Sequence, residues 1–333
     1  TSYHDKAVPP ALRGGYDDYW LASDILEFTS HSYDGHMYRA DGSRREFTEG
    51  RYRVDVQTDW VLEYLDSRSG DKPFYLMVSY IEPHHQNDHH CYEGPRGSKE
   101  RWKDYEVPGD LEGTEGDWRE NFPDYLGQCN SLDENLGRIR AKLEELGIAD
   151  NTLIVYTSDH GSHFCTRNSE YKRACHDACI RIPMIVCGPG FDGGKVVTDL
   201  AGLIDIPETL LAAGGVDVPE FMRGRPLQQI VSGAPDDWRT EVFLQISESH
   251  FGRALRTPRW TYEAVAPDVG GGGLHAQQLV EAHLYDNDAD PHQKNNLVSD
   301  PAHTDIRAEL RQRLTQRIIA AAEPEPTIEP AKV

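Results

Sequence analysis

Long hydrophobic runs are missing from this sequence of 333 residues. The longest apolar run, at residues 74–81, is far shorter than the roughly 20 residues that a membrane helix needs. Positive charge is also scarce, because 34 Lys and Arg face 56 Asp and Glu and give a formal net charge of −22. A nucleic-acid partner calls for a basic face. We therefore expect neither a membrane nor a nucleic acid as a partner, although a metal or a local cluster of cations could still hold an anionic ester.

Paired cysteine motifs are absent as well. The six cysteines form neither a CxxC pair nor a zinc-finger spacing, and they are Cys91, Cys129, Cys165, Cys175, Cys179 and Cys187. Such sparse cysteines do not predict a disulfide scaffold, so mostly free thiols are expected. Packing on one face of a short helix explains Cys175 and Cys179 better than a thiol site does.

Strand-like and helix-like segments alternate along the first two thirds of the chain. Apolar runs predict buried strands at 74–81, 152–157 and 182–187. Apolar residues three or four apart predict a helix at 125–146, with Gly147 as its stop, and an earlier helix is expected at 54–66. This rhythm predicts an α/β fold with a mainly parallel sheet flanked by helices.

The pattern changes near residue 235, where we expect a smaller α+β domain to begin. A short helix at 204–213 closes the larger domain. Strands at 241–246 and 260–265 and a helix at 305–319 then follow. The predicted domains are therefore 1–234 and 235–333, the second with an antiparallel sheet and a terminal helix.

Two predicted strands end in residues that handle metals and protons. One strand is followed by Glu82-Pro83-His84 and the other by Ser158-Asp159-His160-Gly161. Functional groups gather at the carboxyl ends of strands in parallel α/β sheets. Asp159 and His160 could bind a divalent cation, or Asp159 could simply cap the following turn. His84 could act as a general acid, and the alternative is a solvated loop histidine.

Further candidates lie close to these strand ends. Lys172 follows His160 by twelve residues, and its ammonium group suits an anionic oxygen, although most lysines are merely solvated. The loop histidines His85, His89 and His90 raise a zinc alternative, but their spacing is irregular for zinc.

Read together, these motifs resemble the sulfatase family of the alkaline phosphatase superfamily. The matching segments stand in the family's order and run from 73–88 (PFYLMVSYIEPHHQND) through 131–161, 171–190 and 205–215 to 283–297 (HLYDNDADPHQKNNL). The likeness extends from about residue 15 to about residue 297, and it includes the SDHG segment, the lysine after it and the IRIP strand. The resemblance implies an alkaline-phosphatase-like fold and hydrolysis of sulfate esters.

The same resemblance implies roles for individual residues. Asp159 and His160 correspond to two ligands of a calcium ion that holds the sulfate. His84 corresponds to the histidine that contacts sulfate and assists the leaving oxygen, and Lys172 to the lysine that binds the bridging oxygen. These roles are chemically sensible, because a departing alkoxide needs a proton or a cation. A histidine ligand is nevertheless unusual for calcium, which prefers oxygen.

The nucleophile of the family has no counterpart in this chain. Sulfatases convert the cysteine of a C-x-[PA]-x-R motif to formylglycine, and none of the six cysteines stands in that motif. We expect the formylglycine in an N-terminal segment that this chain lacks. The chain alone is therefore predicted not to turn over sulfate esters. The missing segment supplies a central strand in this family, so the resemblance also implies that this chain exposes apolar sheet surface, which promotes aggregation.

The sequence leaves the substrate and the class of function open. His176, Glu248, His250 and Arg253 lie in segments that line the substrate cleft of similar proteins and are candidate contacts with a sulfated small molecule or carbohydrate. The alternatives to a sulfatase are a phosphodiester or phosphonate hydrolase of the same superfamily and a non-catalytic sulfatase-like binding module. The resemblance is compatible with a periplasmic or secreted location.

Overall fold

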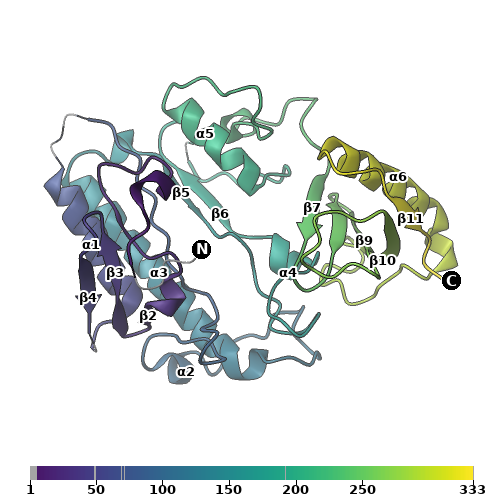
Figure 1. Cartoon of the computed structure of the whole chain (residues 1–333), viewed down its shortest axis with the longest axis horizontal. Helices are drawn as coiled ribbons and strands as arrows, with labels where there is room; N and C mark the ends of the chain where they lie inside the picture. The colour runs from purple at the N-terminus through teal and green to yellow at the C-terminus, as the bar shows by residue number, and fades with distance from the viewer. Residues whose placement is uncertain (1–5, 49, 69, 71, 192, 333) are drawn as a thin grey trace. The chain divides into compact units, whose positions relative to one another are not determined.

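The computed structural model describes residues 6–48, 50–68, 70, 72–191 and 193–332. The chain divides into two compact units (Figure 1). The first unit consists of Thr1–Glu106 and Trp118–Asp150, and the second of Val107–Asp117 and Asn151–Val333. The predicted domain boundary at residue 235 stays a prediction.

The first unit combines a small antiparallel sheet with two long helices. Its strands run in the order β1-β3-β2, and β4 also pairs with β3. The strands are β1 (Leu21–Ala22), β2 (Ser30–His31), β3 (Asp34–Arg39) and β4 (Arg44–Phe47), and the helices are α1 (Arg53–Ser67), α2 (Ser98–Arg101) and α3 (Trp118–Glu145). Met37 and Phe47 of the sheet pack against Val56 and Trp60 of α1, which ties the sheet to the helix.

The two helices predicted in this region are present. Helix α1 matches its predicted range within one residue at each end, and α3 begins seven residues before the predicted start. The first turns of α3 carry the charged residues Arg119 and Glu120, so the apolar spacing did not predict a helix there. The neighbouring side chains of Trp118 and Phe122 are nevertheless buried. The helix ends just before Gly147, whose φ of 69° suits the left-handed turn that follows.

The second unit contains a β-hairpin-like pair and a larger sheet. Strands β5 (Ile154–Thr157) and β6 (Met184–Cys187) pair with each other, and the helices nearby are α4 (Asp177–Ile180) and α5 (Ile206–Ala213). The larger sheet has the order β11-β10-β9-β8-β7. Its strands are β7 (Val242–Ile246), β8 (Gly252–Arg256), β9 (Trp260–Val265), β10 (Gln278–Asp286) and β11 (Thr327–Glu329), and α6 (Thr304–Ala320) follows β10 in the chain.

The larger sheet and α6 enclose the best-developed core of the chain. Leu255, Tyr262 and Leu284 of the sheet are fully buried with Leu310 and Leu314 of α6. The predicted strands at 241–246 and 260–265 and the helix at 305–319 are therefore confirmed, as is the expected α+β character of this region. Short 3-10 helices occur at Pro10–Leu12, Leu26–Phe28, Ala149–Asn151, Leu203–Asp205, Leu227–Gln229 and Pro301–His303.

Two expectations about the strands need correction. Residues 74–81 form no strand, although their side chains alternate between partly buried and exposed, with Tyr75 and Met77 mainly exposed. β5 and β6 are antiparallel rather than parallel. The connection between them holds only the four-residue helix α4, which is too short to serve as the crossover helix that parallel neighbours require. Among the described strands, only β10 and β11 pair in parallel.

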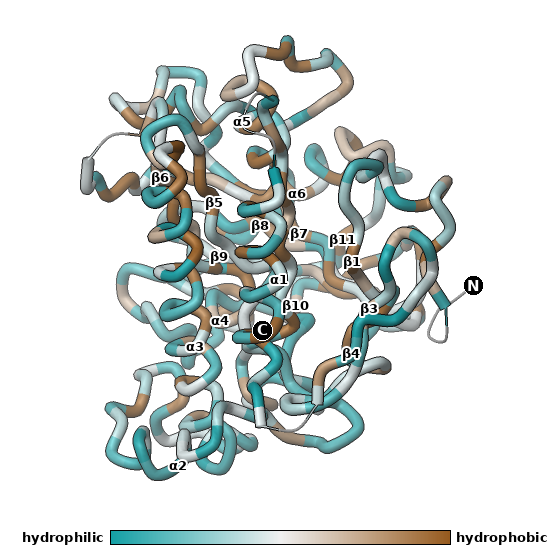
Figure 2. Tube along the Cα trace, turned by 90° about the vertical axis from the view of Figure 1, so that its left-hand side faces the viewer, coloured by the Kyte–Doolittle hydropathy of each residue, from teal (hydrophilic) through white to brown (hydrophobic). Residues whose placement is uncertain are grey.

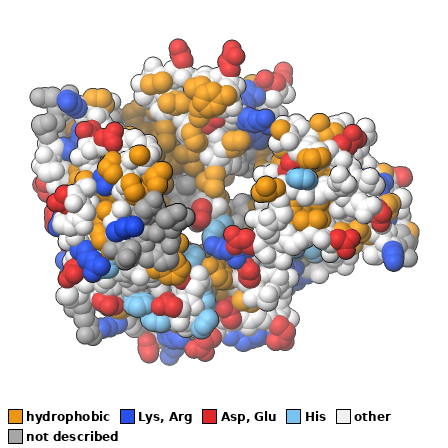
Figure 3. Space-filling model, in the orientation of Figure 1, with side chains coloured by type: hydrophobic (Ala, Val, Ile, Leu, Met, Phe, Trp, Pro, Cys, Tyr) orange, Lys and Arg blue, Asp and Glu red, His pale blue; other side chains and the backbone are white. Residues whose placement is uncertain are grey.

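Hydrophobic colour gathers along β5 and β6, whereas the region of α2 is largely hydrophilic (Figure 2). Exposed apolar side chains also gather over α5 and its flanking loops (Figure 3), where Ile204, Val216 and Phe221 are more than half exposed. Within the part of the chain that is described, no helix has both the length and the apolar character to cross a bilayer.

Candidate functional site

Lys172, His160 and Asp159 form a cluster just beyond the end of β5 in the second unit. The Lys172 Nζ atom lies 3.0 Å from His160 Nε2. The Ser158 hydroxyl donates to the His160 carbonyl at 2.8 Å and so shapes the turn that carries the imidazole. The structure therefore brings together three of the four main candidates, although Lys172 is twelve residues away from His160 in the sequence.

The contacts of His160 determine which of its ring nitrogens carries the proton. Its Nδ1 lies 2.8 Å from the carbonyl oxygen of Gly161, which can only accept, so Nδ1 donates. The neutral ring then has its lone pair on Nε2, and this lone pair accepts a hydrogen bond from Lys172. Burial, followed by repulsion from Arg173, lowers the pKa of the half-buried Lys172. Lys172 is thus a cation that gives up a proton more readily than a solvated lysine.

Asp159 makes the turn-capping contact that was one of its two predicted interpretations, and metal binding by its carboxylate stays a prediction. Its Oδ1 accepts the backbone N–H of His160 at 2.9 Å, as a turn-capping aspartate does. Its side chain is 81% exposed, and Oδ2 lies 3.7 Å from His160 Nε2. Calcium takes six to eight oxygen ligands, so one carboxylate and one imidazole do not complete such a site by themselves. Metal binding by His160 would also require Lys172 to leave the lone pair on Nε2.

His84 lies in the first unit, in the loop that follows the extended segment 72–81. The Arg53 guanidinium, at the start of α1, binds the buried Glu82 carboxylate at 2.9 Å and anchors the beginning of this loop. His84 Nδ1 donates to the His85 carbonyl at 2.5 Å, and Gln128 of α3 donates to the His84 carbonyl at 3.4 Å. His84 is partly exposed, and its Nδ1 is used in the local contact with the His85 carbonyl.

Two of the weaker candidates are buried in the second unit. His176 is 4% exposed, and its Nε2 lies 3.0 Å from the Tyr285 hydroxyl. Burial, followed by the charge of Arg167, lowers the pKa of His176 to about 3, so the ring is neutral. The Arg253 guanidinium is held by Glu323 through contacts of 2.8 to 3.0 Å. These contacts give both residues a structural role, and their role in binding substrate stays a prediction.

The other two weaker candidates are more accessible. The Glu248 side chain is 62% exposed, pairs with Arg173 and has a positive φ of 66°. His250 Nε2 donates to Glu263 Oε1 at 2.8 Å, and this hydrogen bond raises the pKa of His250. Substrate binding by Glu248 and His250 also stays a prediction.

Glu263, which the sequence did not single out, is the buried centre of a network in β9. It accepts hydrogen bonds from His250 and, at 2.6 Å, from His283 Nδ1. Burial favours the neutral carboxyl, but the hydrogen bonds from the two histidines outweigh burial and lower the pKa of Glu263 to about 2. Cys175 also belongs to this group, and burial raises the pKa of its thiol. All six cysteines are free thiols, as predicted.

Models of known protein families match most of this chain. A family model described as Sulfatase matches residues 4–216, which is well over half of the chain. The chain belongs to the sulfatase family. A second model, described as the C-terminal region of N-sulphoglucosamine sulphohydrolase, matches residues 169–320 of this sulfatase chain.

Individual relatives agree with that assignment. The chain is 27% identical over 331 residues to an ulvan-active sulfatase of Formosa agariphila, covering 93% of this chain and 60% of the relative. It is 29% identical over 223 residues to an N-acetylglucosamine-6-O-sulfatase of Bacteroides thetaiotaomicron, covering 62% of this chain and 38% of the relative. The chain thus spans about three fifths of the ulvan-active relative.

A solved structure shows the same fold. A protein of Bacteroides fragilis that was assigned as a sulfatase superposes with a TM-score of 0.80 at 24% identity, covering 96% of this chain and 69% of that one. The predicted alkaline-phosphatase-like α/β fold is therefore confirmed, even though the described strand pairs are mostly antiparallel.

One group of potential ligands escaped the sequence analysis. The zinc alternative considered His85, His89 and His90, but the buried His85 instead lies 3.1 Å from Asn87 through Nδ1. His89 lies near Asp88 and His31, and His31 comes from strand β2. No local spacing could reveal this group, because 57 residues separate His31 from Asp88 in the sequence.

Proposed function

We propose that this chain contributes part of the active site of a sulfatase that hydrolyses sulfate esters of carbohydrates. The observation that carries the proposal is the 3.0 Å contact between Lys172 Nζ and His160 Nε2, beside the exposed Asp159, in a chain of the sulfatase family. The carbohydrate substrate is supported by the names of the matched N-acetylglucosamine-6-O-sulfatase and of the sulphoglucosamine model.

The proposed chemistry starts from the leaving group. When the S–O bond of a sulfate ester breaks, negative charge develops on the bridging oxygen, and a positioned proton or cation stabilises it. Lys172 would supply this stabilisation, because burial lowers its pKa and eases proton donation. His84 would assist the same oxygen through Nε2, since Nδ1 is held by the His85 carbonyl.

A divalent cation and a nucleophile complete the proposed site. A bound calcium ion would neutralise charge on the sulfate, and Asp159 and His160 would be two of its ligands. These two residues alone do not satisfy calcium, which takes six to eight oxygen ligands. The nucleophile, a formylglycine, would come from outside this chain, since no cysteine here stands in the required motif. The chain by itself is therefore expected to be inactive.

The proposal is tested on the product of the complete native reading frame, with a 6-sulfated N-acetylglucosamine as substrate. Substituting Lys172→Ala or His84→Ala is expected to lower kcat by about 10²- to 10⁴-fold, the usual contribution of a proton-transfer group. Lys195→Ala is the matched control, because Lys195 is an exposed lysine whose ammonium group donates to the Val231 carbonyl. The control should keep kcat within about twofold of the wild type.

Three results would contradict the proposal or part of it. Hydrolysis of phosphodiesters without hydrolysis of sulfate esters would favour the phosphoesterase alternative. Tight calorimetric binding of the sulfated sugar without turnover would favour a binding module. Sulfate release by this chain alone, abolished in His84→Ala, would show that the expected inactivity is wrong.

A further inference from the structure

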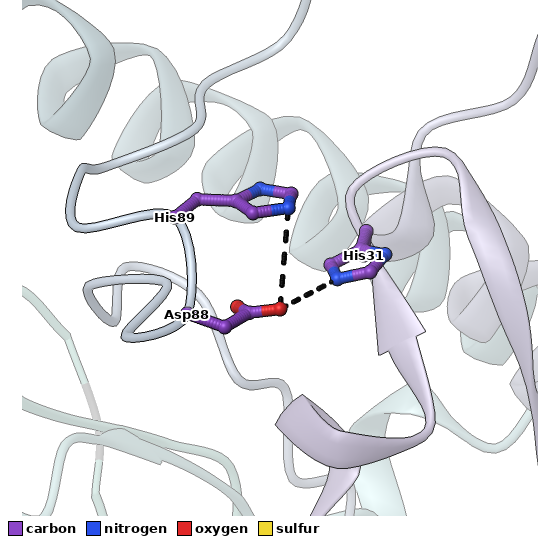
Figure 4. Close-up of side chains that lie close together, drawn as sticks. All are labelled: His31, Asp88 and His89. Atoms are coloured by element: carbon purple, nitrogen blue, oxygen red, sulfur yellow. Dashed lines mark hydrogen bonds and ion pairs between the residues drawn. The ribbon is translucent and has the colours of Figure 1, made fainter.

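Two histidines and an aspartate converge on one point in the first unit. His31 is the last residue of β2, and Asp88 and His89 lie in the loop that follows Glu82. Figure 4 shows the two imidazole rings and the carboxylate pointing toward one another from these separate segments. One ligand atom from each residue lies within 4.8 Å of the others. The side chains are 40%, 51% and 43% exposed for His31, Asp88 and His89, respectively, so solvent reaches the group.

The spacing of these atoms suits a tetrahedral cation. The Asp88 Oδ2 atom lies 2.9 Å from His31 Nε2 and 3.9 Å from His89 Nε2. Tetrahedral zinc with bonds of about 2.0–2.1 Å separates its ligand atoms by about 3.3 Å, a value between the two distances. A hydrogen bond explains the shorter contact, but 3.9 Å is too long for one. A cation shared by the three groups would also bring both Nε2 atoms toward the same carboxylate oxygen.

The outer nitrogens of both histidines face further carboxylates. His89 Nδ1 lies 2.6 Å from Glu93 Oε1, and His31 Nδ1 lies 3.7 Å from Asp34 Oδ1. Metal-binding histidines commonly donate their other ring N–H to a carboxylate, which orients the ring and strengthens the ligand. His89 has that arrangement with Glu93, whereas the 3.7 Å between His31 Nδ1 and Asp34 Oδ1 is an ion-pair distance and too long for a hydrogen bond.

Neutral polar groups hold the acids in place. Gln86 donates to Asp88 Oδ1 at 2.7 Å, which leaves Oδ2 toward the histidines. Ser32 donates to Glu93 Oε2 at 2.7 Å, which leaves Oε1 toward His89. The two imidazole rings stack with centroids 4.5 Å apart and an interplanar angle of 14°. Because the lone pairs lie in the ring planes, one ring has to turn before both rings bind a single ion. The two carboxylates are oriented by their neighbours.

We propose that His31, Asp88 and His89 bind a transition-metal dication such as Zn²⁺. Two imidazole nitrogens and one carboxylate oxygen suit zinc and the late first-row metals and not the all-oxygen preference of calcium. A cavity of about 430 Å³ adjoins the two histidines, and its lining includes His31, His89, Glu93 and Lys99. The ion would link β2 to the loop that also carries His84. This proposal does not depend on sulfatase activity.

The test uses the whole chain after removal of bound metal with a chelator. Zn²⁺ is titrated against a chromogenic indicator, and Co²⁺ is added separately so that its visible spectrum reports the ligand type. His31→Asn and His89→Asn are the test variants. His90→Asn is the matched control, because His90 is exposed in the same loop outside the group, and its φ of 54° suits asparagine.

One equivalent of Zn²⁺ is expected to bind to the wild type and to the control with affinities that agree within about twofold. Each test variant should bind this equivalent at least about 100-fold more weakly, since even outer-shell changes cost 10- to 100-fold. Bound Co²⁺ should give a tetrahedral spectrum without a sulfur charge-transfer band. Circular dichroism of each variant checks that the fold is retained.

An unchanged affinity in His31→Asn and His89→Asn would overturn the proposal, and so would the absence of any Zn²⁺ binding to the wild type. Loss of the tight equivalent only in Asp159→Asn with His160→Asn would also overturn it, because the ion would then belong to the second unit. A sulfur charge-transfer band would assign the ion to cysteine and have the same consequence. None of these results bears on the roles proposed for Lys172 and His84.

Discussion

At the scale of single residues, Glu263 shows how burial and hydrogen bonding compete. Its carboxylate is fully buried, and an isolated buried carboxylate would take up a proton. His250 and His283 prevent this by donating to its two oxygens, at 2.8 and 2.6 Å. The same contacts raise the pKa of His250. The charge on Glu263 therefore depends on two partly exposed rings.

Replacing Glu263 with glutamine is expected to destabilise the protein by about 2–4 kcal/mol at pH 6, because a neutral amide replaces a buried charged acceptor. Urea unfolding measures this loss. Glu248→Gln is the control, because Glu248 is exposed and its ion pair with Arg173 should contribute no more than about 1 kcal/mol. Equal losses in the two variants would show that the network is not a source of stability.

The same network predicts a pH dependence with two limits. The folded pKa of Glu263 is about 2, below its unfolded value of about 4.3, so its contribution is complete above pH 4.3 and is lost as pH falls toward 2. The pKa of His250 in the folded protein is raised above its unfolded value of about 6.5. Its contribution to stability is therefore complete below about pH 6.5 and is lost as the pH rises through the folded pKa. When urea unfolding is measured across this pH range, the free energy of unfolding of Glu263→Gln should change less with pH than that of the wild type at both limits.

At the scale of elements, the first turn of α1 supports the loop that carries His84. Arg53 binds the Glu82 carboxylate through Nε and donates from Nη1 to the Ser30 carbonyl and hydroxyl, both at 3.1 Å. Side chains of Arg53 and Glu82 are 3% and 0% exposed. Helix α1, strand β2 and the loop that carries His84 are therefore joined by the buried guanidinium of Arg53.

Replacing Arg53 with methionine should destabilise the protein by about 3–5 kcal/mol, because it leaves the buried Glu82 carboxylate without its cation. Urea unfolding gives the size of the loss, and hydrogen exchange should be faster in α1 and in residues 82–93. Arg51→Met is the control, because the Arg51–Asp59 pair lies at the surface and should contribute about 0–1 kcal/mol. A loss in Arg53→Met as small as in this control would contradict the proposed support.

At the scale of the whole molecule, both units expose apolar side chains along extended segments. Met77 in the segment 72–81 is 62% exposed, and Ile185 in β6 is 59% exposed. Residues 74–81 are paired with no other described strand. Exposed apolar segments with unpaired backbone groups favour association with other chains. The net charge of −22 opposes such association by repulsion.

The double substitution Met77→Asp with Ile185→Asp should lower light scattering at a given protein concentration. Each apolar side chain contributes on the order of 1 kcal/mol or more when it is buried, so we expect self-association to weaken by about tenfold or more. Leu274→Asp is the control, because Leu274 is 86% exposed in a loop and adds the same kind of charge. If Leu274→Asp lowers scattering equally, net charge and not these segments controls association.

The sequence by itself determined the family, the ranges of most helices and the main candidate residues. These features depend on local order: Asp159 and His160 directly follow an apolar run, and the apolar spacing in 125–146 is that of a helix. Hydrophobic content gave a wrong prediction where the structure also required a neighbouring strand. Residues 74–81 have the composition of a buried strand, but a strand also requires a neighbour with which to exchange hydrogen bonds.

Only the tertiary structure decided which distant residues meet and in which direction strands pair. His31 and Asp88 are 57 residues apart, and Glu263 and His283 lie on neighbouring strands, so no spacing rule could connect them. Their proximity follows from strand register and from the path of the loops, and both depend on packing over the whole unit. The contact between Lys172 and His160 arises in the same way, because the chain after β5 turns back toward the end of the strand.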